Sequence, residues 1–282
     1  MKFIFKLFLD FIALISPKIK GSYIVILNYH SVHQNFSDVT DRWSISVDMF
    51  EKQIKYLVDN NIEIIGTDDI KNIFLRNQQL NKIFVCITFD DGLENNYINV
   101  IPILKKYNIY KSTFFIVANS LINKSDKAWW IKNKINSRLM SIEQIIDLHK
   151  YGYEIGSHSL SHQNLNKVKD NQVENELVES KKILETQFKF NCKSVAIPFS
   201  ISGNTSKELS VKNICSKIGY NYLFLGRFGY IDSQSYNKND LPRIPIYRSD
   251  SMNNFILKIN GKYNFISKIY YLRKKIRYIF GI

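Results

Sequence analysis

Short apolar runs alternate with longer amphipathic stretches along most of the chain, and the two patterns predict two kinds of element. The apolar runs are rich in β-branched and aromatic residues, which is typical of buried strands. They cover residues 23–29, 62–65, 83–89, 112–118, 153–157, 194–197, 220–225 and 241–247. Stretches with apolar residues three and four positions apart predict helices at 47–60, 95–107, 169–188 and 205–217, and one that begins at Ser141. Strands that alternate with helices predict a single α/β domain, with a parallel sheet and helices outside it.

The two ends of the chain carry amphipathic patterns of their own. Residues 1–20 combine Lys2 and Lys6 with many large apolar residues, but Asp10 interrupts the apolar run and no small-x-small cleavage site follows. Residues 263–282 place apolar side chains three and four positions apart among Lys and Arg. Both patterns are typical of helices that lie on an anionic membrane surface. For residues 1–20, a helix packed on the protein's own core is an equal alternative.

The composition of the chain indicates a globular protein whose positive charge favours anionic partners. The chain has 282 residues and a hydrophobic share of 45%, which suits a globular protein with a large core. Its 39 Lys and Arg against 25 Asp and Glu give a net charge of +14, which favours anionic lipid or an anionic glycan. No recognised nucleic-acid motif is present, so we expect no nucleic-acid partner. Three scattered cysteines exclude a disulfide framework or a zinc–thiolate site and predict buried free thiols.

The apolar run 83–89 ends abruptly in Asp90, Asp91 and Gly92. Two adjacent carboxylates at the mouth of a buried strand are electrostatically expensive. Because side chains alternate along a strand, the two acids should point in different directions unless the turn at Gly92 redirects them. That predicts two separate roles. The alternative is a polar strand end that caps the next helix, since Asp is a good N-cap.

His158 and His162 follow another predicted strand, four residues apart. That spacing lets both imidazoles meet one metal ion if the segment turns helically after the strand. With one carboxylate from the Asp pair they would form a set of two histidines and one acid, with positions open for water and substrate. The metal would hold a water and polarise a carbonyl, and the second carboxylate could take the proton of that water. His30, at the end of strand 23–29, is available to protonate a leaving group.

These residues carry a resemblance to a known family. Thr-Phe-Asp-Asp-Gly at 88–92 and His-Ser-Leu-Ser-His at 158–162 strongly resemble the first two motifs of polysaccharide deacetylases, the NodB-homology carbohydrate esterases. Asn-Tyr-His-Ser-Val at 28–32 is similar to the branch that deacetylates poly-N-acetylglucosamine. In that branch the catalytic histidine precedes the Asp pair, as a circular permutation of the motif order. The resemblance runs from about residue 26 to residue 247.

The resemblance implies a fold and a division of the chain. It implies a single distorted (β/α)7 barrel, which we place at residues 21–250. Residues 1–20 are then an amphipathic N-terminal segment, and residues 251–282 a basic amphipathic C-terminal tail.

It also implies a role for each candidate residue. Asp90 becomes the general base and His30 the general acid. Asp91, His158 and His162 become the ligands of one divalent ion, which we expect to be Zn²⁺, with Co²⁺ or Ni²⁺ as alternatives.

The chain departs from the family pattern at its third motif. Pro198 and Phe199 are kept and are expected to bind substrate, but the Arg that many members carry before this pair is absent, and Ser200 stands where Gly is usual. Arg243 could instead orient Asp90 and hold its pKa down. A purely structural residue at the barrel end is the alternative. The chain also has no histidine after His162, so the late catalytic histidine of the family is missing unless His30 replaces it.

The expected function is a metal-dependent hydrolase that removes N-acetyl groups from sugars of a bacterial surface polysaccharide or its precursor. We expect it at the periphery of the membrane on the cytoplasmic side, with an extracellular or cell-surface location as the alternative. Two rival functions stay open: a glycan-binding protein that keeps the barrel without turnover, and an amidase for a small non-sugar amide. The missing third-motif Arg favours the binding protein, whereas the intact set of acids and histidines favours the enzyme.

Overall fold

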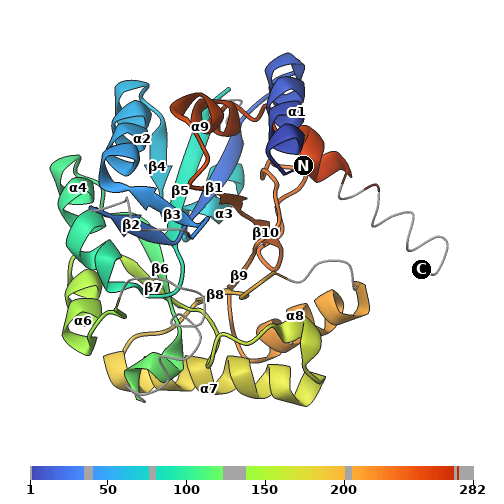
Figure 1. The fold of residues 1–282 in the computed structure, drawn as a ribbon. Coiled ribbons are helices and arrows are strands. Elements are labelled where there is room, and N and C mark those ends of the chain that lie inside the picture. Colours follow the sequence, from blue (N-terminus) through green and yellow to red (C-terminus); the bar gives the residue numbers. More distant parts are fainter. Residues whose placement is uncertain are drawn as a thin grey trace.

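The structure is a computed structural model that describes residues 2–34, 41–75, 81–122, 138–200, 205–269 and 272. Its centre is a parallel sheet that curves into a barrel, with helices around the outside (Figure 1). Six strands follow one another around this sheet: β1 Tyr23–Tyr29, β5 Ile83–Phe89, β6 Ser112–Ile116, β7 Glu154–Ser157, β8 Ser194–Ala196 and β9 Tyr222–Leu225. A further strand, β4 Glu63–Ile65, pairs with the first half of β5.

One short segment closes the barrel. Strand β10 Leu241–Pro242 pairs with β9, and strand β11 Ile244–Pro245 pairs with β1. The two strands are separated by Arg243 alone, so the same segment borders both edges of the sheet. Seven strand positions therefore surround the barrel, and the predicted distorted (β/α)7 fold is confirmed.

The helices lie outside the strands and largely match the predicted positions. They are α2 Val47–Asp59, α3 Asp69–Leu75, α4 Ile101–Lys106, α6 Ile142–Lys150, α7 Asp170–Phe188, α8 Thr205–Lys217 and α9 Met252–Ile259. The predicted helix 95–107 is divided, because a π-helical turn, η1 Asn96–Val100, precedes α4. Pro102 has no backbone N–H and stands in the first turn of α4, where none is needed. Ser141 caps α6 in a capping box with Gln144.

Smaller elements complete the described chain. Strands β2 Ser31–His33 and β3 Ser44–Ser46 form a separate two-stranded sheet, and η2 Ala118–Leu121 and η3 Leu165–Lys167 are short 3₁₀ turns. At the N-terminus, α1 Lys2–Ile15 is helical. The predicted basic tail, residues 251–282, is described as far as residue 269 and at Leu272, and its remaining residues lie outside the described part of the chain. None of the described helices combines the length and the apolar character needed to span a bilayer.

The alternation of side chains along each strand divides the core in two. Along β5, Phe84 and Cys86 belong to the cluster inside the barrel, whereas Val85 and Ile87 pack under the helices. Gly156 on β7 leaves space for the buried ring of Phe115, since a Cβ there would lie 2.6 Å from that ring. All three cysteines are buried and free, as predicted.

Candidate active site

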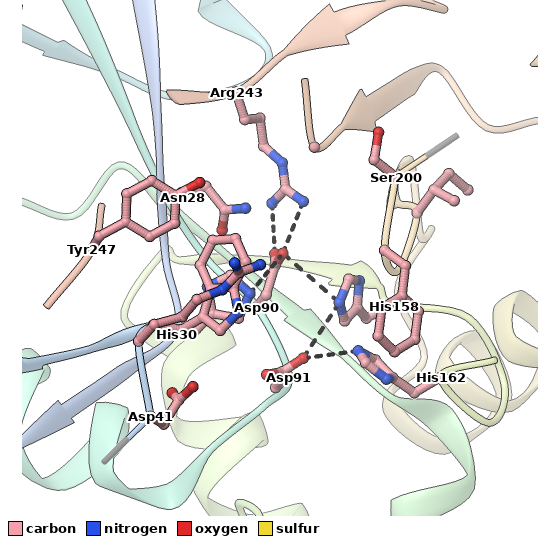
Figure 2. Close-up of a pocket in the computed structure, with 15 residues that line it drawn as sticks. Asn28, His30, Asp41, Asp90, Asp91, His158, His162, Ser200, Arg243 and Tyr247 are labelled. Atoms are coloured by element: carbon pink, nitrogen blue, oxygen red, sulfur yellow. Dashed lines mark hydrogen bonds and ion pairs between the residues drawn. The ribbon is translucent and has the colours of Figure 1, made fainter. Parts of the chain in front are cut away.

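A cavity of about 510 Å³ opens at the C-terminal ends of the strands. Seven of the eight predicted site residues line it: His30, Asp90, Asp91, His158, His162, Phe199 and Arg243 (Figure 2). Pro198 is buried and is not among the lining residues. The topology explains this gathering, because parallel strands deliver the residues that follow them to one end of a barrel.

Asp90 continues the inward-facing row of β5 and meets Arg243. Phe84, Cys86 and Asp90 have the same parity, so the Asp90 carboxylate points into the barrel, where it is 2% exposed. Nη1 and Nη2 of Arg243 donate to Oδ1 and Oδ2 of Asp90 at 2.6 and 2.8 Å (Figure 2). This forked pair fixes both carboxylate oxygens. Burial alone would raise the pKa of Asp90, but the charge of Arg243, followed by those of His158 and His30, outweighs it and lowers that pKa.

The closing segment of the barrel explains how Arg243 reaches this position. It stands between β10 and β11 and is 1% exposed. Its backbone is held where the two sheet edges meet, and its side chain crosses the barrel interior to Asp90. The two interpretations of Arg243 thus describe two parts of one residue: its backbone stands at the barrel end, and its side chain orients Asp90.

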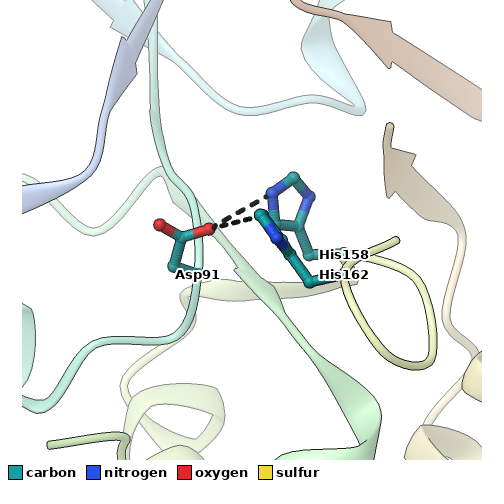
Figure 3. Close-up of side chains that lie close together, drawn as sticks. All are labelled: Asp91, His158 and His162. Atoms are coloured by element: carbon teal, nitrogen blue, oxygen red, sulfur yellow. Dashed lines mark ion pairs between the residues drawn. The ribbon is translucent and has the colours of Figure 1, made fainter. Parts of the chain in front are cut away.

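Asp91 faces away from Arg243 and toward the two histidines. Its backbone φ is +77°, and the φ of Gly92 is +67°, so the chain leaves β5 through two left-handed residues that redirect the second carboxylate. Oδ1 of Asp91 lies 3.4 Å from Nε2 of His158 and 3.2 Å from Nε2 of His162 (Figure 3). The two adjacent acids therefore have different main partners, Arg243 for Asp90 and His162 for Asp91, while Nε2 of His158 lies near both, 3.7 Å from Oδ2 of Asp90. Burial would raise the pKa of Asp91, but His158 and His162 hold it well below its usual value.

The geometry of His158 fits a metal ligand. Its Nδ1 lies 2.8 Å from the carbonyl oxygen of Ala196, which can only accept, so Nδ1 carries the proton. A neutral ring then presents the Nε2 lone pair to the Asp91 carboxylate, and that arrangement is repulsive unless a proton or a cation lies between them. Burial disfavours the charged ring, but Asp90 and Asp91 outweigh burial and raise the pKa of His158.

The ligand atoms of Asp91, His158 and His162 all lie within 4.8 Å of one another. Two imidazole nitrogens and one carboxylate oxygen form a donor set for one divalent transition metal. The Nδ1–H of His158, held by a backbone carbonyl, is the supporting contact that metal-bound histidines usually make. The group therefore fits a single divalent metal ion, whose identity the donor set does not decide.

The two histidines come together without the helical turn that was the stated condition for their four-residue spacing to serve one metal ion. Residues 158–162 are irregular, with left-handed φ values of +64° at Ser159 and +57° at His162. Glu176 on α7 holds this shape: its carboxylate accepts from the backbone N–H groups of Leu160 at 3.1 Å and Ser161 at 2.9 Å. It also accepts from the Ser161 hydroxyl at 2.5 Å. Sequence reasoning missed Glu176, because it is one of several acids on a long amphipathic helix.

We expect Glu176→Ala to lower the affinity of the site for Zn²⁺ by about 10–100-fold, as the loss of a supporting contact usually does. Without this carboxylate the backbone N–H groups of Leu160 and Ser161 lose their acceptor, so the segment can relax and His162 can drift from Asp91. Competition with a chromophoric chelator would measure the dissociation constant. Glu174→Ala is the matched control, because Glu174 lies on the same helix and pairs with Lys217 at the surface. Equal affinities for the two variants would contradict this role.

His30 occupies the side of the cavity opposite His162. Its Nε2 lies 3.9 Å from Oδ2 of Asp90, and Trp43 stacks on its ring at 4.6 Å between centroids. The ring of Tyr247 packs in turn against the ring of Trp43, at 5.0 Å between centroids. Burial lowers the pKa of His30, against the opposing charges of Asp91 and Asp90. Trp43 was not predicted from the sequence as a site residue. The only signal for it was a tryptophan in a polar loop between two predicted elements.

Phe199 forms the rim near the predicted metal ligands. Its side chain is 59% exposed, and its ring lies 5.0 Å from the ring of His162. Phe199 and Ser200 have left-handed φ values of +57° and +58°, so the chain after β8 turns sharply at the cavity. An exposed aromatic ring beside a polar pocket can pack against the apolar face of a sugar.

Comparisons with known proteins agree on the family. The sequence profile described as polysaccharide deacetylase matches residues 77–223, just over half of the chain. The Bacillus subtilis protein YxkH, named as a polysaccharide deacetylase, is 28% identical over 169 residues; these are 60% of this chain and 54% of that protein. This chain thus spans about half the length of that relative. A Staphylococcus aureus protein named poly-beta-1,6-N-acetyl-D-glucosamine N-deacetylase is 27% identical over 223 residues, 72% of this chain and 73% of its own.

Solved structures show the same fold. The Streptococcus pyogenes deacetylase PplD superposes with a TM-score of 0.69 at 20% identity, over 85% of this chain and 99% of that one. IcaB from Ammonifex degensii superposes with a TM-score of 0.67 at 18% identity, over 87% and 98%. His30 and Arg243 lie outside the residues that the family profile matches, so the interpretation of these two rests on the geometry of the site.

Proposed function

The chain is a member of the polysaccharide deacetylase family, and from this premise we propose that it removes N-acetyl groups from sugars of a bacterial surface polysaccharide or its precursor. The observation that supports this most is the separation of the two adjacent acids. Asp91 faces two imidazoles in a donor set for one metal ion, while Asp90 is held by Arg243 outside that set. A metal-dependent hydrolase of an amide uses both parts side by side.

In the proposed reaction, water adds to the acetamide carbonyl carbon, and the bond between that carbon and the sugar nitrogen then breaks. The products are acetate and a sugar amine. A metal ion held by Asp91, His158 and His162, for which we propose Zn²⁺, would polarise the carbonyl and acidify the water. Asp90 takes the proton from the water. The lowered pKa of Asp90 keeps this base ionised at neutral pH.

We propose His30 as the group that protonates the leaving nitrogen. Burial lowers its pKa, so it is neutral at the start of a cycle and needs a proton. Asp90 Oδ2 lies 3.9 Å from its Nε2, a gap that one water can bridge. The proton that Asp90 removes from the attacking water can therefore pass through that bridge to His30 and then to the sugar nitrogen. The proton balance closes without an outside acid. Trp43, stacked on the imidazole, limits its rotation and keeps it facing the cavity.

For the substrate class we propose glycans that contain N-acetylglucosamine. The likeness to the Staphylococcus aureus deacetylase, which is named for poly-beta-1,6-N-acetyl-D-glucosamine, supports this choice. Phe199 and Trp43 offer aromatic surface on two sides of the cavity, which suits the apolar face of a sugar ring. The rival interpretation as a glycan-binding protein rested on the missing third-motif Arg, and it loses weight because Arg243 supplies a guanidinium to Asp90.

Metal removal tests the proposed function. We expect the purified protein to release acetate from poly-β-1,6-N-acetylglucosamine, to lose this activity after chelation, and to regain it with one equivalent of Zn²⁺, Co²⁺ or Ni²⁺. A panel of chitin oligomers, peptidoglycan fragments and small N-acetyl amides would separate the glycan substrate from the amidase alternative. Acetate release that survives complete chelation would contradict the metal mechanism. A fully metallated protein that binds the glycans and releases no acetate would favour the binding protein.

A further inference from the structure

Four large apolar side chains of helix α1 lie on the outside, whereas Ala13 of this helix is buried and Leu9 and Ile12 are partly buried. Phe8, Phe11, Leu14 and Ile15 are 57%, 60%, 61% and 70% exposed. Asp10, the only acid of this helix, faces the protein, where Oδ1 accepts from the Tyr263 hydroxyl at 2.5 Å. A surface helix of a globular protein usually has apolar residues toward the core and polar residues outside, so four exposed large apolar side chains on the outer face are unusual. The outer face of α1 is therefore built for contact with an apolar phase.

The C-terminal segment lies beside α1 and extends this face. Lys262 Nζ donates to the carbonyl oxygens of Ser16 at 2.5 Å and Leu14 at 3.4 Å, which fastens the turn after α9 to the end of α1. Figure 1 shows α1 next to the red helical turns that follow α9. Ile269 and Leu272 there are 46% and 59% exposed. We call the outer face of α1, together with Ile269 and Leu272, the terminal surface.

The basic charge of the chain is concentrated in the same two segments. Residues 1–22 and 251–282 contain eleven Lys and Arg and one acidic residue, Asp10. They supply ten of the fourteen net positive charges from fewer than a fifth of the residues. One of these charges, that of Lys258, is buried and paired with Asp250, so it does not act at the surface. Lys18, Lys20 and Lys268 are exposed. Apolar side chains inside a basic segment match the headgroup region of an anionic bilayer, which offers negative charge above an apolar interior.

We propose that the terminal surface docks the protein onto an anionic lipid bilayer, with α1 lying in the interface. Apolar insertion and basic attraction act together, as stable attachment to a membrane surface requires two signals. A second copy of the chain would explain the apolar side chains but not the charge, since two such surfaces would bring like charges together.

Docking in this way leaves the cavity open. Tyr23, the first residue of β1, donates its hydroxyl to the carbonyl of Ile259 at the end of α9, beside the terminal surface. His30 follows the last residue of β1 at the other end. A seven-residue strand spans about 20 Å, so the terminal surface and the site lie at opposite ends of β1. The proposal is thus independent of the reaction assigned to the site.

Vesicle flotation with the full chain tests the proposal. We expect the protein to float with vesicles of equal phosphatidylglycerol and phosphatidylcholine, and much less with phosphatidylcholine alone. Raising the salt from about 0.05 to about 0.5 M should weaken the binding, because salt screens the charge attraction. Leu14→Glu should lower the partition coefficient by about tenfold or more, since it replaces an inserted apolar side chain by an anion.

Leu209→Glu is the matched control, because Leu209 lies on α8 with an exposed fraction of 59%, against 61% for Leu14. It should bind vesicles like the unaltered chain, and both variants should keep the basal acetate release on a water-soluble glycan. The proposal is overturned if phosphatidylglycerol vesicles do not bind the protein, or if the two variants bind equally. It is also overturned if light scattering shows a lipid-free dimer that Leu14→Glu dissociates, because the occupant is then a second copy.

Discussion

Replacing Asp90 with Asn is expected to lower kcat for acetate release by about 10²–10⁴-fold, the range that a positioned general base contributes. The amide cannot take the proton of the attacking water. The metal ligands are untouched, because Asp90 lies outside the group formed by Asp91, His158 and His162. The variant should therefore keep one metal ion per chain, which metal analysis of the purified protein would measure together with kcat.

The adjacent substitution is the control. Asp91→Asn makes the same chemical change one residue away, but it removes a carboxylate that faces both Nε2 atoms. We expect this variant to lose metal affinity, and added Zn²⁺ should restore part of its activity. Added metal should not restore Asp90→Asn. Undiminished acetate release by Asp90→Asn, or equal metal loss in the two variants, would refute the division of roles between the two acids.

The sequence predicted correctly those parts of the fold and of the site that a local pattern of residues determines. Strands β1 and β5 match their predicted bounds, because a run of β-branched and aromatic residues between polar segments marks where a strand begins and ends. The positions of His30, Asp90 and His158 followed, since each comes directly after such a strand. Alternation along β5 also predicted that Asp90 and Asp91 would diverge. In the structure Asp90 pairs with Arg243 and Asp91 faces His162, with His158 near both.

Features that depend on contacts between residues far apart in the sequence could not be predicted from local patterns. The irregular turn that carries His162 depends on Glu176, which comes from the following helix. The two imidazoles therefore come together without the helical turn that the sequence interpretation set as the condition for a shared metal ion. The stacking of Trp43 on His30 depends on a loop that has no periodic pattern. For Arg243 the sequence left two interpretations open, because only the closed barrel shows that a residue between β10 and β11 points to Asp90.

Replacing Arg243 with Met is expected to lower the free energy of unfolding of the metal-free protein by about 3–5 kcal/mol at neutral pH, because it leaves the buried Asp90 carboxylate without its main partner. The double variant Arg243→Met/Asp90→Asn should recover part of this loss, since it removes the stranded charge as well. Urea denaturation of the two single variants and the double variant would give the interaction energy. Strictly additive losses would contradict a coupled pair.

The pH dependence of this loss has a definite sign. In the unaltered chain the pKa of Asp90 is lowered, so its stabilising contribution is present above the unfolded pKa of about 3.9 and is lost as the pH falls through the folded value. Without Arg243, burial dominates and raises that pKa, so the ionised carboxylate destabilises the fold at neutral pH and this penalty fades on acidification. The difference in unfolding free energy between the two proteins should therefore be largest near pH 7 and shrink toward about pH 4.

Arg227→Met is the control for loss of a buried arginine. Its partner Asp240 keeps an ion pair with Lys212, so the loss of unfolding free energy should be smaller and should not follow the titration of Asp90. A cost for Arg243→Met that stays constant over this pH range would show that the side chain stabilises the barrel through packing alone.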